Sequence, residues 1–215
     1  MFNAEEKREL KKITELYGAV KTVILKAEEI SGVSDTQVIN ELRHAFDHFM
    51  RITSVKLEIV PDDDLGEDYI KDNFKKTYGH VYRSGYDALD WVTLIIRDDM
   101  IDIMKQFPLE TINEVCPEYY REIKADVEQI SNEIASIRAK KDVGIDHFDN
   151  FLEYVELMKR LENHNITLTS KVNAMTEYTD KLKKEKRKEQ MINIAIGIVI
   201  GLSVGGIVFI ASTLL

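Results

Sequence analysis

Apolar residues follow a helical spacing along most of the chain. They recur every three or four positions in residues 4–30, and this period marks one face of an α-helix. The same spacing predicts helices over residues 36–60, over 67–107 with a possible break at Gly79 or Gly85, and over 117–141. Because the chain has only three prolines and ten glycines, we expect an all-α helical bundle and no sheet.

The longest apolar pattern follows residue 144. From Phe151 to Leu182 its positions alternate spacings of three and four for more than four heptads, which is typical of a coiled-coil seam. This seam would be buried in an antiparallel hairpin with residues 117–141, and equally in a parallel stalk formed by several copies of the chain. We expect the N-terminal (upper) half of the seam to pack within the body of one chain and the C-terminal (lower) half to face neighbouring copies. Asn165 on the seam is the kind of polar residue that fixes register.

The last 25 residues, 191–215, contain no charged residue. At about 1.5 Å per residue they form about 37 Å of helix, enough to cross a hydrocarbon core of about 30 Å. We therefore expect a single C-terminal transmembrane helix. Gly197, Gly201 and Gly205 recur at four-residue spacing, which predicts close contact between the helices of a homo-oligomer. A ring of such helices could line a pore.

Charge divides the chain. Residues 181–190 carry six basic and two acidic side chains, whereas residues 1–180 carry 23 basic and 36 acidic ones. The basic run beside the apolar run predicts a cytoplasmic N-terminal domain and a single-pass protein of the cell (inner) membrane. The expected divisions are a helical bundle (1–142), a coiled-coil-like stalk (143–182), a basic juxtamembrane segment (183–190) and a transmembrane helix (191–215).

Composition disfavours some classes of function and of structure. An acidic body disfavours general nucleic-acid binding, because phosphate contacts need clustered Lys and Arg. Cys116 is the only cysteine, so one chain cannot build a disulfide framework. The N-terminus has no apolar run, and we expect no secretory signal peptide.

Two dense polar clusters are candidates for chemistry. One contains His44, Asp47 and His48, and the other contains His80, Arg83 and Asp87. They would meet if their two helices pack antiparallel. His44 and His48 are four residues apart on one helical face, so with His80, and with Asp47 or Asp87, they could bind a divalent metal ion. The alternative is an ordinary polar network of ion pairs between residues four apart.

The run Arg43-His44-x3-His48 resembles the R-polar-x3-H motif of HEPN domains, which are all-helical modules common in bacterial defence ribonucleases and toxins. The resemblance implies that His48 transfers a proton, Arg43 steadies phosphate charge and His44 holds the polar second position, with RNA as the partner and no cofactor. On a continuous helix, however, Arg43 and His48 point about 140° apart. The architecture is also similar to that of CRISPR-associated membrane accessory proteins with divergent HEPN motifs.

These features together predict a tail-anchored, oligomeric helical membrane effector or accessory protein. We expect it to act through membrane helix association or pore formation, and the resemblance implies a setting in prokaryotic antiviral defence. The pattern identifies no trigger and no protein partner. A membrane-tethered, metal-independent HEPN-like ribonuclease and a membrane-linked scaffold are the alternatives.

Overall fold

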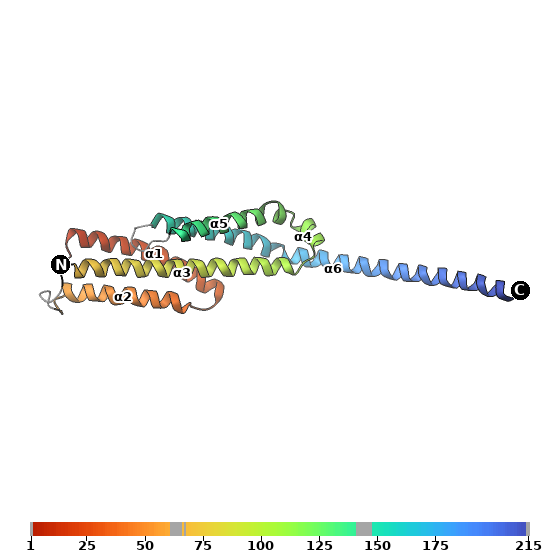
Figure 1. The fold of residues 1–215 in the computed structure, drawn as a ribbon, viewed down its shortest axis with the longest axis horizontal. Coiled ribbons are helices and arrows are strands. Elements are labelled where there is room, and N and C mark those ends of the chain that lie inside the picture. Colours follow the sequence, from red (N-terminus) through yellow and green to blue (C-terminus); the bar gives the residue numbers. More distant parts are fainter. Residues whose placement is uncertain (1, 61–65, 67, 141–147, 214–215) are drawn as a thin grey trace.

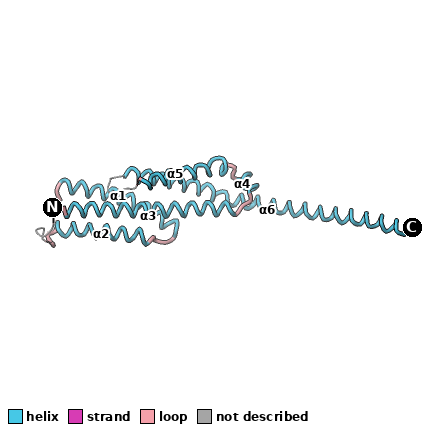
Figure 2. The backbone as a smooth tube through the Cα atoms, in the orientation of Figure 1, coloured by secondary structure: helices cyan, strands magenta, loops and turns pink. Residues whose placement is uncertain are grey.

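The computed structural model describes residues 2–60, 66, 68–140 and 148–213, with side chains as far as residue 202. All regular structure in this part of the chain is helical, which confirms the all-α prediction (Figures 1 and 2). The elements are α1 (Ala4–Ser31), α2 (Thr36–Lys56), α3 (Tyr69–Lys105), α4 (Leu109–Val115), the π-helical segment η2 (Tyr119–Ile123), α5 (Lys124–Ala139) and α6 (Phe148–Thr213).

Local side chains set the ends of the first two helices. Asn3 and Glu6 form a capping box at the start of α1, in which each side chain accepts a hydrogen bond from the other's backbone N–H. Gly32, with φ 71°, ends this helix in the left-handed conformation that glycine adopts without steric cost. Asp35 then caps α2 by accepting two backbone hydrogen bonds. The short segment between α1 and α2 therefore ends one helix and caps the next.

Helix α3 lies at the centre of the bundle and packs against α1, α2 and α6 (Figure 1). It runs antiparallel to α2, since Ser84 donates a hydrogen bond to the backbone of Val38 at one end while Asn73 contacts His48 near the other. The possible break at Gly79 or Gly85 is absent from α3, which is continuous from Tyr69 to Lys105.

The second half of the bundle is an antiparallel pair of helices. Asp126 of α5 contacts Arg160 and His164 of α6. The predicted seam is the buried stripe of α6, and its largest members are Phe151, Tyr154, Met158, Leu161, Leu168 and Met175.

The lower half of the seam departs from the prediction that it faces neighbouring copies. Thr179 is buried, and its hydroxyl lies 2.9 Å from that of Thr111 in α4. The short helix α4 covers the stripe there, so intrachain packing accounts for it as far as Thr179.

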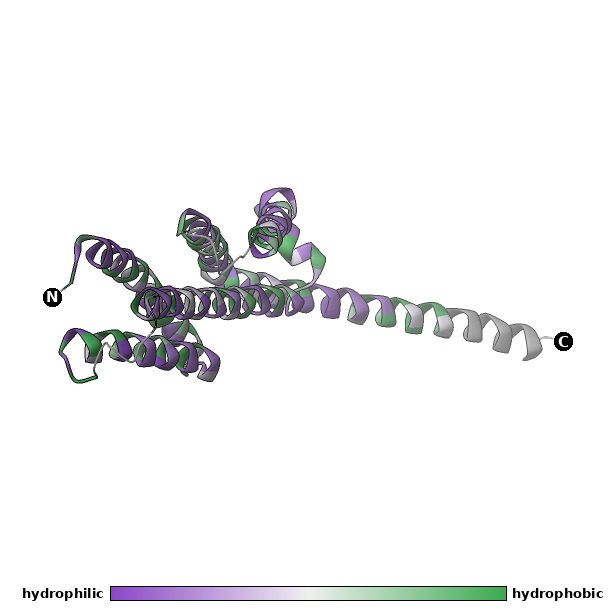
Figure 3. Ribbon diagram, turned by 60° about the vertical axis from the view of Figure 1, so that its left-hand side comes forward, coloured by the Kyte–Doolittle hydropathy of each residue, from purple (hydrophilic) through white to green (hydrophobic). Residues whose placement is uncertain are grey.

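Beyond the bundle, α6 continues as a projecting helix (Figure 1). Figure 3 shows the residues of this projection changing from hydrophilic next to the bundle to mostly hydrophobic farther along. In the part of the chain that the structure describes, no helix has the length and apolarity needed to span a membrane. The predicted span, 191–215, extends past residue 202, the last residue whose side chain is described.

Candidate functional site

Three histidines meet where α2 packs on α3. His44 and His48 lie one turn apart on α2, and His80 lies opposite them on α3. The ring centroid of His80 is 5.2 Å from that of His44 and 5.3 Å from that of His48. Antiparallel packing of the two helices thus brings the two polar clusters of the sequence together.

Glu41 and Arg83 complete the centre of this cluster. Glu41 Oε2 lies 2.9 Å from His80 Nδ1 and accepts a 2.8 Å hydrogen bond from Arg83 Nε. Arg83 Nη2 is 2.6 Å from the same His80 Nδ1. A carboxylate only accepts and a guanidinium only donates. His80 Nδ1 can therefore donate to Glu41 or accept from Arg83, and in either tautomer one of these two contacts is unfavourable.

The environment shifts the titration of both central groups. Burial lowers the pKa of the His80 imidazole, and the hydrogen bond with Glu41 opposes this shift only in part. Burial raises the pKa of Glu41, but the hydrogen bonds and charges of His80 and Arg83 outweigh it and hold the pKa below its ordinary value. At neutral pH the pair is thus a neutral imidazole beside an ionised carboxylate.

His48 is held in one orientation by Asn73. The Asn73 amide donates to the backbone carbonyl of Tyr69 at 2.8 Å, which turns its oxygen toward His48 Nδ1, also at 2.8 Å. Because an amide oxygen only accepts, Nδ1 of His48 carries the proton. In the neutral form of this ring the lone pair is therefore on Nε2.

The other residues of the predicted site lie apart from this centre. Arg43 is exposed and has no hydrogen bond or ion pair with any residue that the structure describes. Asp47 is exposed and pairs with Arg51 at 2.7 Å on the surface of α2. Asp87 is half-buried on α3, seven residues beyond His80. The HEPN-like pair Arg43 and His48 is thus not joined by a direct contact within one chain.

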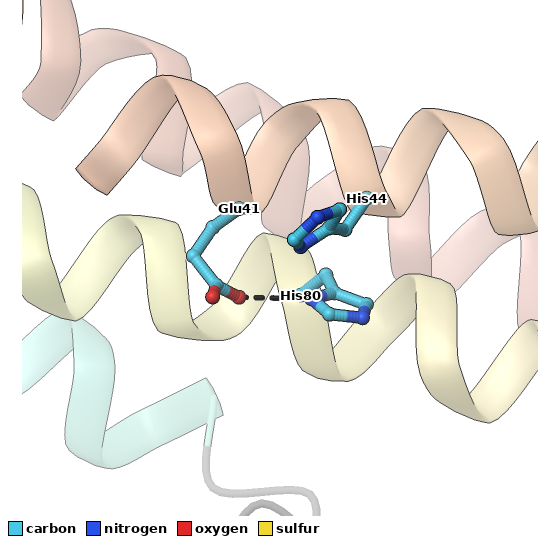
Figure 4. Close-up of side chains that lie close together, drawn as sticks. All are labelled: Glu41, His44 and His80. Carbon is cyan, nitrogen blue, oxygen red and sulfur yellow. Dashed lines mark hydrogen bonds and ion pairs between the residues drawn. The ribbon is translucent and has the colours of Figure 1, made fainter. Parts of the chain in front are cut away.

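Glu41 is the central residue that the sequence analysis did not single out. It precedes His44 by three residues and His48 by seven, so all three fall on one face of α2. Ligand atoms of Glu41, His44 and His80 all lie within 4.8 Å of one another, an arrangement that could hold a metal ion. Figure 4 shows the three side chains pointing toward one another from the two helices.

The predicted membrane contact residues are on the projecting part of α6. A methyl group added at Gly197 or Gly201 would meet no atom within 4 Å. Gly205 lies beyond the residues whose side-chain surroundings the structure describes.

No protein-family model, no curated protein and no solved structure matches this chain. Its own residues are therefore the whole basis for a functional assignment.

Proposed function

We propose that the chain is a tail-anchored membrane effector or accessory protein, with its acidic helical bundle in the cytoplasm and its copies associated through the C-terminal helix. The observation that carries this proposal is the exposure of large apolar side chains on α6 after residue 190. Eight of them occur in twelve residues: Met191, Ile192, Ile194, Ile196, Ile198, Val199, Ile200 and Leu202.

The distribution of these side chains favours lipid over a protein groove. At about 100° per residue, the eight positions cover about 240° of the helix circumference. The remaining sector holds the uncharged residues Asn193, Gly197 and Gly201. A soluble amphipathic helix keeps its apolar residues in one stripe, which a single neighbouring helix can cover. An apolar surface this wide, with no charged residue on the remaining face, is instead suited to a bilayer, and residues 203–215 continue the uncharged run.

Charge supports the same orientation. The six basic side chains of residues 181–190 lie between the bundle and the apolar run. They suit the cytoplasmic headgroup region, where Lys and Arg are attracted to anionic lipids. The bundle itself is acidic, so the same headgroups repel it and keep it away from the membrane surface.

Membrane extraction of the full-length chain tests the anchor. We expect the chain to stay with membranes through a carbonate wash. Replacing Ile196 and Val199 with lysine should release it, because a charge within a span opposes insertion, at a cost that reaches about 3 kcal/mol at the middle of the span. Ile196→Leu/Val199→Leu is the matched control and should stay bound. A wild-type chain that washes off membranes and remains soluble without detergent would refute the anchor.

Association through the glycine face is tested separately. Gly197→Leu/Gly201→Leu/Gly205→Leu should abolish crosslinked oligomers in membranes and any depolarisation that expression causes, because small residues permit close helix contact. Ile198→Leu/Ile200→Leu changes other positions and should preserve both. If the glycine variant keeps its oligomers and its effect while His48→Ala loses an RNA-cleaving activity, the ribonuclease alternative replaces this proposal.

A further inference from the structure

We propose that Glu41, His44 and His80 bind one divalent transition-metal ion of the zinc class, in a site that links α2 to α3. The site lies within the helical bundle and does not depend on how the C-terminal helix is used. Two histidines and one carboxylate form a ligand set that zinc uses, with a solvent molecule in the remaining position.

Arg83 already places a cation between two of the proposed ligands. Its Nε donates to Glu41 Oε2 at 2.8 Å, and its Nη2 lies 2.6 Å from His80 Nδ1. Glu41 Oε2 and His80 Nδ1 are themselves 2.9 Å apart. Ligands of a tetrahedral zinc ion, with bonds of about 2.0 Å, are separated by about 3.3 Å. The carboxylate and the imidazole therefore need to separate only slightly to share a metal ion in place of the guanidinium.

His44 supplies the third ligand. It follows Glu41 by three residues, so the same face of α2 presents both side chains. Its ligand atom lies within 4.8 Å of those of Glu41 and His80. Because His44 is exposed and has no hydrogen bond with a described residue, its ring can turn toward the ion without breaking a hydrogen bond.

Neighbouring rings hold His80 in place before any metal arrives. The His80 ring stacks on His48 with an interplanar angle of 16° and meets His44 edge-on at 63°. His48 is in turn fixed by Asn73. A ligand whose ring is already oriented loses little conformational freedom when it binds an ion.

Metal binding on these ligands has one specific competitor. The guanidinium of Arg83 must leave Glu41 and His80, and its side chain is 32% exposed, so it can swing into solvent. Removing that guanidinium should therefore strengthen metal binding. If Arg83, Glu41 and His80 formed only a structural ion-pair network, removal of the guanidinium would not increase the affinity for a metal ion.

Titration of the full-length chain in detergent with Zn²⁺, and with Co²⁺ for its visible absorption, tests the site. Wild type should bind one ion per chain, acquire the absorption bands of protein-bound Co²⁺ and unfold at a higher temperature with Zn²⁺. His44→Ala should weaken binding by at least roughly tenfold. Because His44 is exposed, this variant should fold normally without metal.

Two further variants complete the test. Arg83→Met should bind Zn²⁺ more tightly than wild type, and His164→Ala, which changes a histidine of α6 outside the site, should still bind one ion per chain. Equal affinity of wild type and His44→Ala, or no saturable binding by the wild type, would overturn the site. If Arg83→Met gains no affinity, Glu41 and His80 do not share the ion in place of the guanidinium, which also overturns the proposal.

Discussion

Gly85 allows three helices to meet at a distance that a side chain would prevent. A Cβ atom at this position of α3 would lie 2.6 Å from Val20 Cγ2 of α1 and 2.6 Å from Phe151 Cε2 of α6. Phe151 and its neighbour Tyr86 are completely buried. This glycine therefore serves close packing, although a glycine in a helix interior is otherwise unfavourable.

We expect Gly85→Ala to lower the free energy of unfolding by about 1–3 kcal/mol, because an added methyl group overpacks a filled core. Gly18→Ala is the control, since no atom lies within 4 Å of its added methyl group. It should raise stability by up to about 1 kcal/mol through helix propensity alone. Urea denaturation followed by circular dichroism measures both. Stabilisation of both variants to the same extent would show that the junction at Gly85 is loosely packed.

Single residues also show where the sequence pattern stops being informative. The period of apolar residues predicts that Leu16, Val20 and Phe151 are buried, because burial follows the face of a helix. The same pattern marks Gly85 only as a possible helix break, because a sequence does not show whether a glycine interrupts a helix or lets another helix pack closely against it. The sequence pattern also does not reveal the hydrogen bonds that Glu41 and Asn73 make with histidines, because these contacts join different helices. Their partners lie 39 and 25 residues away in the sequence, and only the register of α2 on α3 brings them together.

At the level of elements, α4 depends on one buried polar pair. The hydroxyls of Thr111 and Thr179 are both buried and lie 2.9 Å apart, which joins α4 to α6. Ile112 and Thr111 are the buried residues of this seven-residue helix. Its apolar contact area is therefore small, and the hydroxyl pair provides much of its specific orientation.

A double-mutant cycle tests this junction. Thr179→Val leaves the Thr111 hydroxyl buried without its partner, which should cost about 1–3 kcal/mol of unfolding free energy. Thr111→Val/Thr179→Val removes both hydroxyls at nearly constant shape and should recover most of that loss. Thermal unfolding measures the four proteins of the cycle. Additive losses in the double variant would show that the two hydroxyls do not interact.

The long elements were predictable and the short ones were not. Helices α1, α2, α3 and α6 each carry several turns of periodic apolar residues, and their predicted centres are confirmed. Helix α4 has too few residues to show a period. The predicted helix 117–141 is confirmed for Lys124–Ala139, but Tyr119–Ile123 form a wider π-helical turn. Because α4 was not anticipated, the lower half of the α6 stripe had no visible partner within the chain.

The whole molecule consists of a packed bundle and a projecting helix with few shared contacts. Among the α6 side chains that the structure describes, as far as residue 202, the last buried one is that of Thr179. Beyond it, the exposed pair Lys186 and Glu110 at 3.4 Å ties the projection to α4, and exposed ion pairs contribute little to stability. The folding energy of the bundle therefore resides in residues before 180.

A truncated chain of residues 1–190 should consequently unfold cooperatively at nearly the same temperature as the full-length chain. A second truncation, residues 1–174, should unfold at a lower temperature, because it removes Met175 from the core and exposes the Thr111 side chain that Thr179 contacts. Circular dichroism melts of the truncations distinguish the cases. Loss of the cooperative transition in residues 1–190 would mean that the projecting helix contributes to the fold of the bundle.

Helix α6 runs without interruption from the bundle into the projecting apolar segment, so the two are joined by continuous helix. From Thr179 to Met191 the helix rises about 18 Å without a glycine or a proline, so there is no joint at which the bundle could swivel independently. Any twist or axial displacement imposed on the buried half of α6 must appear at the apolar end with the same sense. In the proposed oligomer, the face of the projecting helix that one copy turns toward another would therefore be set by how that helix is rotated within its own bundle.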